Sequence, residues 1–599
     1  MHFFKAYSGQ AMVAAAMLFG ISTSATAFET RFRVSGGETL QAQLRASSRV
    51  MALDTGTDPT SQDILAAARA DYRQLLTTLY RQGYYGGSIR ILVDGREAAS
   101  LSPLDVPVRI STVEISVQTG LPFSFAELRI APLAPGSALP GELARGAPAR
   151  ADVITAASQA ALTGWRDASH AKARIASQRI TADHRNQTLD AEVNIAPGPA
   201  VSFGAVTVVT AGAVRTDRVL DIAGPITGEA FSPATIERAA ARLRRTGAFN
   251  SVAFSEAEKL GAGETLDLSL SLVEAPKRRF GFGAELSSAE GVALNGFWMH
   301  RNLLGGAERL RLEGEIKGIA GDSGGEDYSI SARFDRPATL WNDTALYISG
   351  EIAHLEEPGF TSDNMETGIG LNAWISDQLQ ASAGISFRYS EVTESGTQQS
   401  FSHLMFPLSA TLDRRDNRLD ARSGSYASLE AIPFAGLNGV ASGARLNADL
   451  RLYRSLGDAQ RFTLAGRFQY GTILGAGIDE VPADWLYFSG GGGTVRGQPY
   501  QSLVLDPGGS SESGGRSYAG LSGEIRAGIR GNFSAVGFLD AGVVDQDLIP
   551  SSGGEFHAGA GLGLRYDTGF GPLRLDLAAP VAGDTGAGVQ LYIGIGQAF

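Results

Sequence analysis

From residue 277 to residue 599, apolar and polar side chains alternate with the two-residue period of β-strands. In the segment RLRLEGEIKG, residues 309–318, Leu310, Leu312 and Ile316 fall on one face and every charged side chain falls on the other. Three later segments alternate in the same way: YSISARFD at 328–335, LSGEIRAGIR at 521–530 and QLYIGIGQAF at 590–599. The pattern predicts a long succession of strands, each with one apolar face and one charged face.

A soluble β-sandwich also alternates, so the period alone leaves two architectures open. Charges of both signs on the polar face, repeated over many strands, favour lipid on the apolar side and a wet lumen on the other. At about 20 residues for a strand and its turn, residues 277–599 predict about sixteen antiparallel strands. We therefore expect an all-β transmembrane barrel, and in its last strand Leu591, Ile593, Ile595 and Phe599 share one face.

Between residues 28 and 276, short strand-like runs alternate with helical ones. One helix is predicted from Ser232, a good N-cap residue, through Pro233 at the first helical position to Gly247. The order strand, helix, helix, strand, strand recurs at roughly 80-residue intervals. We expect three small α+β units and leave one irregular α/β domain as the alternative. The predicted units span residues 28–105, 106–199 and 200–276.

The N-terminus has the features of a secretory signal. Lys5 precedes an apolar run at residues 11–20, and Ala25 and Ala27 supply the small residues that a signal peptidase reads. A short membrane anchor is the alternative, but the run is too short to span about 30 Å of hydrocarbon. We expect residues 1–27 to be removed.

Composition and motifs argue against several classes of function. The chain has no cysteine, which excludes disulfides, thiolate metal sites and cysteine nucleophiles. A net charge of −12 provides no basic field for nucleic acid. There is no H-E-x-x-H motif, and the glycine-rich GAGLGL at 559–564 lies within the strand alternation. We expect no enzymatic activity, no cofactor and no metal site.

The interval between the strand at 462–471 and the strand at 521–530 is longer than a hairpin needs. It contains GGGGTVRGQPY at 490–500. A solvated outer loop is one interpretation. A phosphate-binding loop is a second, although the P-loop lysine and the strand-then-helix context are missing. A loop folded into the lumen is the third, and it would carry Arg496 inward.

The strand FSAVGFLDAGVV at 533–544 supports the third interpretation. Phe538 and Asp540 share a face opposite Leu539, so Asp540 should face the lumen. A carboxylate in a poorly solvated lumen requires a partner, and a guanidinium can bind it with two hydrogen bonds. Arg496 is a candidate partner. Other charges, including Glu524 and Arg526, also face inward, and parity does not choose among them.

These motifs resemble those of the BamA-type outer-membrane insertase superfamily, which includes the two-partner secretion transporters. TVRGQPYQSL resembles the family's lumenal-loop motif and would place Val495, Arg496, Gly497 and Tyr500 there. Gln498 departs from the aromatic residue that the family has at its position.

GFLDAG resembles the family's strand motif that pairs with the loop arginine, which would be Phe538 and Asp540 here. Residues 559–581 resemble the family's last strands, and Phe599 resembles its C-terminal assembly signal. The three N-terminal units are similar to periplasmic POTRA domains. The resemblance therefore covers essentially the whole mature chain.

The resemblance implies α+β POTRA-like repeats in the periplasm, followed by an outer-membrane barrel of a Gram-negative bacterium. Three such units make the chain most similar to the TamA branch, which implies a TamB-like inner-membrane partner. The implied function is the assembly of unfolded, autotransporter-like outer-membrane clients by lateral opening of the seam between the first strand, near Phe280, and the last strand. A two-partner secretion pore or the barrel end of a lipid-transfer conduit is the alternative.

Overall fold

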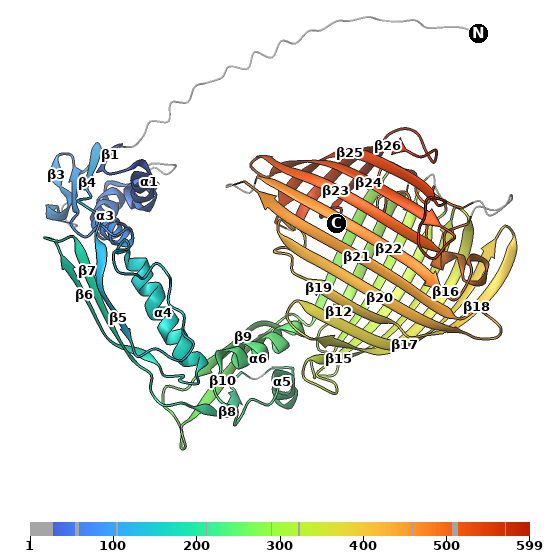
Figure 1. Cartoon of the computed structure of the whole chain (residues 1–599), viewed down its shortest axis with the longest axis horizontal. Coiled ribbons are helices and arrows are strands. Elements are labelled where there is room, and N and C mark those ends of the chain that lie inside the picture. The colour runs from blue at the N-terminus through green and yellow to red at the C-terminus, as the bar shows by residue number, and fades with distance from the viewer. Residues whose placement is uncertain are drawn as a thin grey trace, which may run out of the picture. The chain divides into compact units, whose positions relative to one another are not determined.

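The computed structural model describes residues 28–53, 59–102, 106–210, 212–288, 290–321, 324–457, 461–505, 513–569 and 571–599. The predicted signal peptide, residues 1–27, lies outside the described residues. The chain divides into two compact units (Figure 1). The first comprises Met1–Ser202 and Ala230–Pro233, and the second comprises Phe203–Glu229 and Ala234–Phe599. Among the described helices, none combines the length and the apolar character needed to cross a bilayer.

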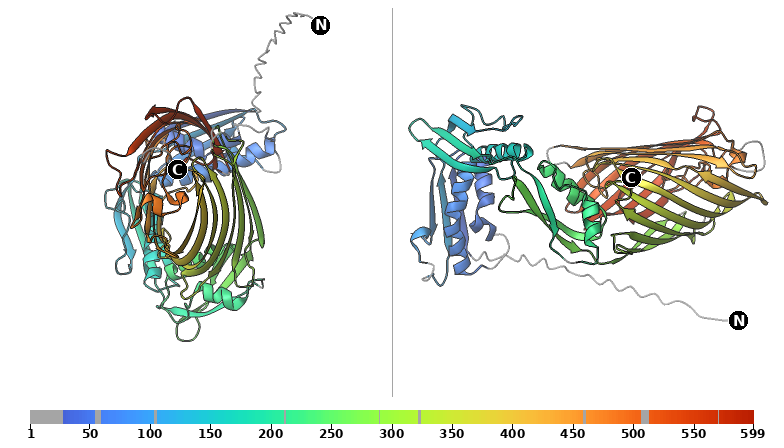
Figure 2. Two further views of the ribbon diagram at one scale, coloured as in Figure 1. Left: turned by 90° about the vertical axis from the view of Figure 1, so that its right-hand side faces the viewer. Right: turned by 90° about the horizontal axis from the view of Figure 1, so that it is seen from below.

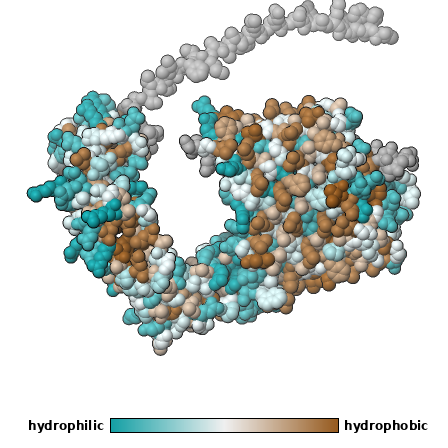
Figure 3. Space-filling model, in the orientation of Figure 1, coloured by the Kyte–Doolittle hydropathy of each residue, from teal (hydrophilic) through white to brown (hydrophobic). Residues whose placement is uncertain are grey.

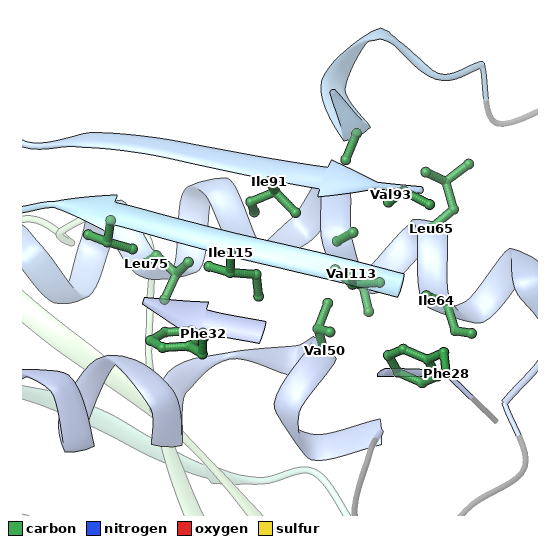
Figure 4. Close-up of a cluster of buried hydrophobic side chains, with 14 of the residues drawn as sticks. Phe28, Phe32, Val50, Ile64, Leu65, Leu75, Ile91, Val93, Val113 and Ile115 are labelled. Atoms are coloured by element: carbon green, nitrogen blue, oxygen red, sulfur yellow. The ribbon is translucent and has the colours of Figure 1, made fainter. Parts of the chain in front are cut away.

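The first sheet has the strand order β1-β4-β2-β3 and packs against three helices. Its elements are β1 (Glu29–Ser35), α1 (Glu38–Ser47), α2 (Arg49–Leu53), α3 (Ser61–Arg81), β2 (Ser88–Val93), β3 (Arg96–Glu97) and β4 (Thr112–Gln118). Thr60 caps α3 by accepting a hydrogen bond from the Asp63 backbone. Phe32, Leu75 and Ile115 belong to the core between sheet and helices (Figure 4). Strand β4 follows residue 105, where the first unit was predicted to end, yet it pairs with β1 and β2.

The second sheet has the order β5-β7-β6 and is covered by one helix. Its elements are β5 (Ser124–Ala131), α4 (Ala151–Asp167), β6 (Arg174–Asp183) and β7 (Thr188–Ala196). The repeated pattern predicted two helices, but residues 132–150 form none. Four prolines and three glycines in that stretch disfavour a helix.

The third sheet has the order β8-β10-β9 and carries the two predicted helices. Its elements are β8 (Ser202–Val208), α5 (Thr216–Ala223), α6 (Pro233–Arg245), β9 (Phe249–Glu256) and β10 (Thr265–Glu274). Helix α6 begins at Pro233, and Gly247 follows it with φ +69°, which favours glycine at a helix end. Here the order strand, helix, helix, strand, strand is the one that the sequence predicts.

The rest of the chain forms a closed antiparallel barrel (Figures 1 and 2). Strands β18 and β19 both lie between β17 and β20, and they are separated only by Phe406 and Pro407. They form one interrupted strand, because proline has no N–H to donate. The barrel therefore has sixteen strands, as predicted. Its elements are β11 (Arg278–Ser287), β12 (Gly291–His300), β13 (Arg309–Ile319), β14 (Asp327–Pro337), β15 (Thr344–Glu357), β16 (Phe360–Trp374), β17 (Leu379–Glu394), β18 (Thr397–Met405), β19 (Leu408–Asp413), β20 (Gly424–Gly436), β21 (Gly443–Leu456), β22 (Phe462–Leu474), β23 (Ser517–Arg530), β24 (Phe533–Asp545), β25 (Glu555–Thr568), β26 (Gly571–Ala582) and β27 (Gln590–Ile595).

The two faces of the barrel wall differ as the alternation predicts. On β23, Leu521, Ile525 and Ile529 are 56 to 63% exposed, whereas Glu524 and Arg526 are buried in the lumen. Hydrophobic residues cover much of the outer face of the barrel (Figure 3). Strand length varies around the wall, from 16 residues in β17 to 6 in β27.

The third sheet and the barrel belong to the same compact unit. Arg242 of α6 binds Asp343, in the β14–β15 turn, through two hydrogen bonds of 2.6 and 3.0 Å. Arg245 adds a third of 3.1 Å. These contacts identify the end of the barrel that lies beside α6. Because β11 starts at this end and sixteen antiparallel strands follow one another, β27 also ends here.

Candidate functional site

The described residues between β22 and β23, 475–505 and 513–516, fold into the barrel. Trp485 packs its ring against Phe434 with the ring centroids 4.9 Å apart, and Leu503 belongs to the same buried cluster. Val495 is fully buried, and Arg496 is 2% exposed. Of the three interpretations of this loop, the structure therefore shows the lumenal one.

The structure brings Arg496 to Asp540. The guanidinium donates from Nε to Oδ2 at 2.7 Å and from Nη2 to Oδ1 at 3.1 Å. The Arg496 backbone N–H donates to the same carboxylate at 3.2 Å. The Phe538 ring lies under the guanidinium, with Cζ 3.6 Å from the ring centroid. One strand thus supplies both a charged and an aromatic partner.

Arg496 also reaches two carboxylates that lie on other strands. Its Nη1 donates to Glu524 at 2.8 Å and to Asp576 at 3.3 Å. Glu524 is held as well by Arg526 at 2.8 Å, and Asp576 is held by Arg565. Burying so many charges is tolerated only because each one has a partner.

Asp576 and Arg565 did not enter the sequence prediction. The segment GPLRLDLAAP at 571–580 puts Arg574 and Asp576 on the face opposite Leu573, Leu575 and Leu577. That parity would have identified Arg574 and Asp576 as lumenal charges.

Gly497 and the glycines before Arg496 bring the loop against both strands that flank the seam. The Gly497 N–H donates to the Tyr592 hydroxyl of β27 at 3.1 Å. Gly497 has φ +94°, and a Cβ there would lie 2.8 Å from backbone atoms of Ala579, so the close approach requires glycine. On the other side, the Gly492 N–H donates at 2.8 Å to Glu290, in the turn between β11 and β12. The loop is therefore bonded to both sides of the closure.

Gln498 is fully buried and fixes the loop to β25 and β26. Its side-chain nitrogen donates to the carbonyl oxygens of Ala558 at 2.7 Å and Ala582 at 3.0 Å. Its side-chain oxygen accepts from the Thr585 hydroxyl at 2.8 Å. An amide can make all three bonds and an aromatic ring cannot, so the departure from the family motif has a structural use here.

Tyr500 lies apart from the arginine network. Its hydroxyl donates to Glu357, at the end of β15, at 3.0 Å. Burial and the neighbouring Glu357 carboxylate raise the pKa of Tyr500, so the phenol remains a hydrogen-bond donor. Tyr500 fixes the loop on the side of the lumen formed by the early strands.

The closure of the barrel is its weakest strand pairing. β11 pairs with β12 along its whole length of 10 residues. It pairs with β27 only at Leu286 with Ile593 and at Ser287 with Tyr592. Ser288 extends the contact through a 3.0 Å hydrogen bond from its N–H to the Leu591 carbonyl. Residues 278–285 of β11 have no strand partner on the seam side among the described residues.

The alternation predicted that Phe599 shares a face with Leu591, Ile593 and Ile595. The structure shows that it does not. Strand β27 ends at Ile595, and Gly596, with φ +99°, changes the chain direction. Ile595 is 65% exposed on the outer face, whereas Phe599 is 8% exposed and packs inside the barrel. The strand period stops applying once the strand ends.

Among the described residues, no group of three or more His, Asp or Glu side chains is placed to hold a metal ion. The main features of the site are a buried charge network, a loop bonded to both sides of the barrel closure, and a strand edge in β11 that is unpaired on the seam side. Hydrogen bonding and strand exchange are the chemistry that this arrangement supports.

Residues 302–599 match the Omp85 superfamily domain. The structure of BamA from Haemophilus ducreyi lacking POTRA domains 1-3 is similar, with a TM-score of 0.60 and 16% sequence identity. That comparison covers 79% of this chain and 100% of the other. CdiB from Acinetobacter baumannii is also similar, with a TM-score of 0.52, 13% identity and coverage of 79% and 90%. At these identities the two structures show a shared fold.

Proposed function

We propose that this chain, an outer-membrane protein that carries an Omp85 superfamily domain, assembles other β-barrel proteins by opening the seam of its own barrel. Omp85 superfamily barrels are insertases or secretion barrels that handle protein clients in the outer membrane. The POTRA-like units lie in the periplasm. Within that frame we infer the role of the TamA branch, with autotransporter-like clients.

The seam is the observation that carries the proposal. Only two residue pairs join β11 to β27. The free edge at 278–285 lies toward the end of the barrel from which the chain enters, which is where a client would arrive. An unpaired edge presents N–H and C=O groups to any extended chain, and strand addition needs no covalent chemistry.

The lumenal loop supports the same role. It donates hydrogen bonds to Glu290 on one side of the seam and to Tyr592 on the other. Its arginine is bonded to β23, β24 and β26. We infer that the loop stabilises the closed seam while residues 278–285 of β11 remain unpaired on the seam side.

We also infer that an extended segment of a TamB-like partner pairs with β6, the edge strand of the second sheet. In the described chain β6 pairs only with β7. Eight of its ten residues are exposed, so both faces of the strand are open to a partner. The contact would again be strand addition.

The alternative is a pore, for a secreted partner or for lipid. The lumen holds residues 475–505, with Trp485 and Val495 buried in it. A conducting pathway would require this whole segment to leave the lumen, whereas opening of the seam would require only one of its two bonds across the seam to break. We therefore favour assembly over conduction.

A disulfide across the seam tests the proposal, and the absence of native cysteine keeps the test clean. Leu286 and Ile593 are directly paired, so the double variant Leu286→Cys, Ile593→Cys meets the need for Cα atoms within about 7 Å. The matched control is Phe282→Cys, Ile593→Cys, which is offset by four residues, about 13 Å along the strand.

We expect oxidation to cross-link the first pair only. Oxidised protein should then stop assembling an autotransporter-like client in liposomes and should recover on reduction. The control should assemble clients in both states. Normal client assembly by fully cross-linked protein would reject lateral opening and favour the pore.

A further inference from the structure

A cavity of about 290 Å³ lies between helices α5 and α6 and the ends of the barrel strands beside them. Arg242 and Arg245 line it from α6, and Arg309 and Arg333 line it from the neighbouring strands β13 and β14. Both helices and the barrel belong to the second compact unit. Among the described residues that line the cavity, none belongs to β11 or β27. The cavity is therefore separate from the seam, and what it binds does not depend on seam opening.

The two barrel arginines of the cavity share one buried carboxylate. Asp335 accepts hydrogen bonds from Arg309 at 2.9 and 3.2 Å and from Arg333 at 3.1 Å. Of the described lining residues, Asp335 is the one that carries a carboxylate. Two guanidinium groups and one carboxylate leave one positive charge in excess on the barrel side of the cavity.

The two arginines of α6 are also incompletely neutralised. Both bind Asp343, which lies outside the cavity lining. Arg245 reaches a second carboxylate, Asp377, at 3.4 Å, but that side chain is 86% exposed and the pair is screened by water. The lining as a whole therefore favours an anion.

Several hydrogen-bond donors in the lining have no partner within the described chain. Arg333 uses its Nε, and its two Nη atoms donate to no described residue, while the Tyr347 ring holds the guanidinium with Cζ 4.2 Å from the ring centroid. Arg309 likewise leaves Nη1 unused. Asn372 is buried, and its side-chain amide makes no hydrogen bond with any residue of the described ranges. Buried polar groups are normally paired, so these donors indicate a ligand that supplies oxygen acceptors.

The cavity also has an apolar part. The apolar contributors are Ile222, Ala338, Ala345 and Trp374. The Trp374 ring is held by Arg245, whose Cζ lies 5.5 Å from the ring centroid. A lining that combines charged donors with apolar side chains suits an anionic group attached to an uncharged organic body.

We propose that this cavity binds a phosphate monoester carried on an uncharged organic body. Arg309 and Arg333 bond the phosphate oxygens. Asn372 bonds an ester or hydroxyl oxygen beside them, and the body packs against Trp374. A phosphate is favoured over a carboxylate because it carries up to two negative charges and three terminal oxygens, which match the three free Nη groups of two guanidinium forks. A lipid headgroup and a soluble phosphate ester share this chemistry.

The test uses the full chain in neutral detergent micelles, checked for a folded barrel by its mobility on unboiled gels. Native mass spectrometry gives the number of bound molecules and their Kd. The lipid probe is lysophosphatidic acid, and the soluble probe is glycerol 3-phosphate, which has the same phosphate monoester without the acyl chain. Lysophosphatidylcholine supplies the acyl chain without a net charge, and the capped tetrapeptide Ala-Glu-Glu-Ala supplies carboxylates without a phosphate.

Three variants distinguish this cavity from general attraction of anions to the barrel. Arg333→Gln removes the guanidinium with two free Nη groups, and Asp335 keeps Arg309, so no carboxylate is left isolated. Asn372→Ala removes an amide that has no protein partner to lose. Arg336→Gln is the matched control, because Arg336 is exposed on the opposite face of β14 and its loss lowers the net charge equally.

We expect one molecule of lysophosphatidic acid to bind, at least about tenfold more tightly than lysophosphatidylcholine. Arg333→Gln should weaken this binding by about tenfold or more and Asn372→Ala by about threefold, since each removes hydrogen bonds to the ligand. Arg336→Gln should have no effect. Glycerol 3-phosphate binding with the same dependence on Arg333 would support a soluble ester as the ligand, and binding of the lipid probe alone would support a lipid headgroup.

Equal binding of the two lipids, or equal affinities in Arg333→Gln and Arg336→Gln, would overturn the proposal. Binding of the tetrapeptide with neither phosphate probe would overturn it as well, in favour of an acidic polypeptide. If Arg333→Gln fails to fold, Asn372→Ala takes its place, and an unchanged affinity for lysophosphatidic acid in that variant would count against the site.

Discussion

Removing the charge of Arg496 should destabilise the barrel through one carboxylate in particular. In Arg496→Met, the unbranched apolar side chain still packs on Phe538. Glu524 keeps Arg526 and Asp576 keeps Arg565. Asp540, which is 1% exposed, keeps only the backbone N–H of residue 496.

The expected loss of stability follows from these remaining contacts. Breaking a buried pair and leaving the other charge in place costs about 3–5 kcal/mol, and water entering the lumen lowers this figure. Asp540→Asn should cost less, about 1–3 kcal/mol, because the guanidinium retains Glu524 and Asp576. In the double variant no unpaired charge remains. We therefore expect it to be more stable than Arg496→Met, with a coupling energy above about 1 kcal/mol.

The assay is urea unfolding of purified protein in micelles, followed by the fluorescence of its five tryptophans. Arg467→Met is the matched control. Arg467 binds Asp449 at 2.8 Å, but Arg451 binds the same carboxylate at 2.6 Å. Its removal leaves no isolated charge and should cost no more than about 1 kcal/mol. Additive effects at positions 496 and 540, or equal losses in Arg496→Met and Arg467→Met, would refute the reasoning.

Two further outcomes are expected. Neighbouring N–H groups of a strand point to opposite edges, so either Gln178→Pro or Arg179→Pro in β6 removes an N–H from the free edge. That variant should abolish co-purification of a TamB-like partner while its circular dichroism stays unchanged, and retention of the partner by both variants would argue against strand addition at β6. The side-chain hydrogen bond from Arg242 lowers the pKa of Asp343. This contact between α6 and the β14–β15 turn therefore stabilises the fold at pH values above the unfolded Asp pKa of about 3.9. The stabilisation is lost as the pH falls through the lowered pKa of the folded state. Asp343→Asn should speed hydrogen exchange in α6 at pH 7 and match wild type at about pH 2, and a difference that persists at that pH would contradict the assignment.

Periodicity predicted the barrel and the inward direction of Asp540 because an alternating strand has only two faces, and the length of the alternating region predicted the strand number. It also placed Glu524 and Arg526 in the lumen. Parity indicates the face of the strand on which a residue lies. It does not indicate which residues of other strands or loops that residue contacts. The meeting of Arg496 with Glu524 and Asp576 depends on how the loop folds, and four consecutive glycines leave that path open.

Other features depended on information that a single sequence does not carry. The register of β11 against β27 is set by closure of the whole barrel. Gln498 was visible as a departure from a motif, but its bonds to Ala558 and Ala582 are made to backbone carbonyls, which no residue type encodes. The inward turn of Phe599 required knowing where β27 ends.

The shortness of β27 also has a consequence for the surrounding lipid. Six residues extend about 20 Å along a strand, and a barrel tilt of 35–45° reduces this to about 15 Å of height. The apolar band of an outer-membrane barrel is about 25 Å tall. The bilayer beside the seam must therefore thin or admit water to meet this strand, at a cost of fractions of a kcal/mol per Å of mismatch. On the far side, the 16-residue β17 is tall enough to impose no such deformation.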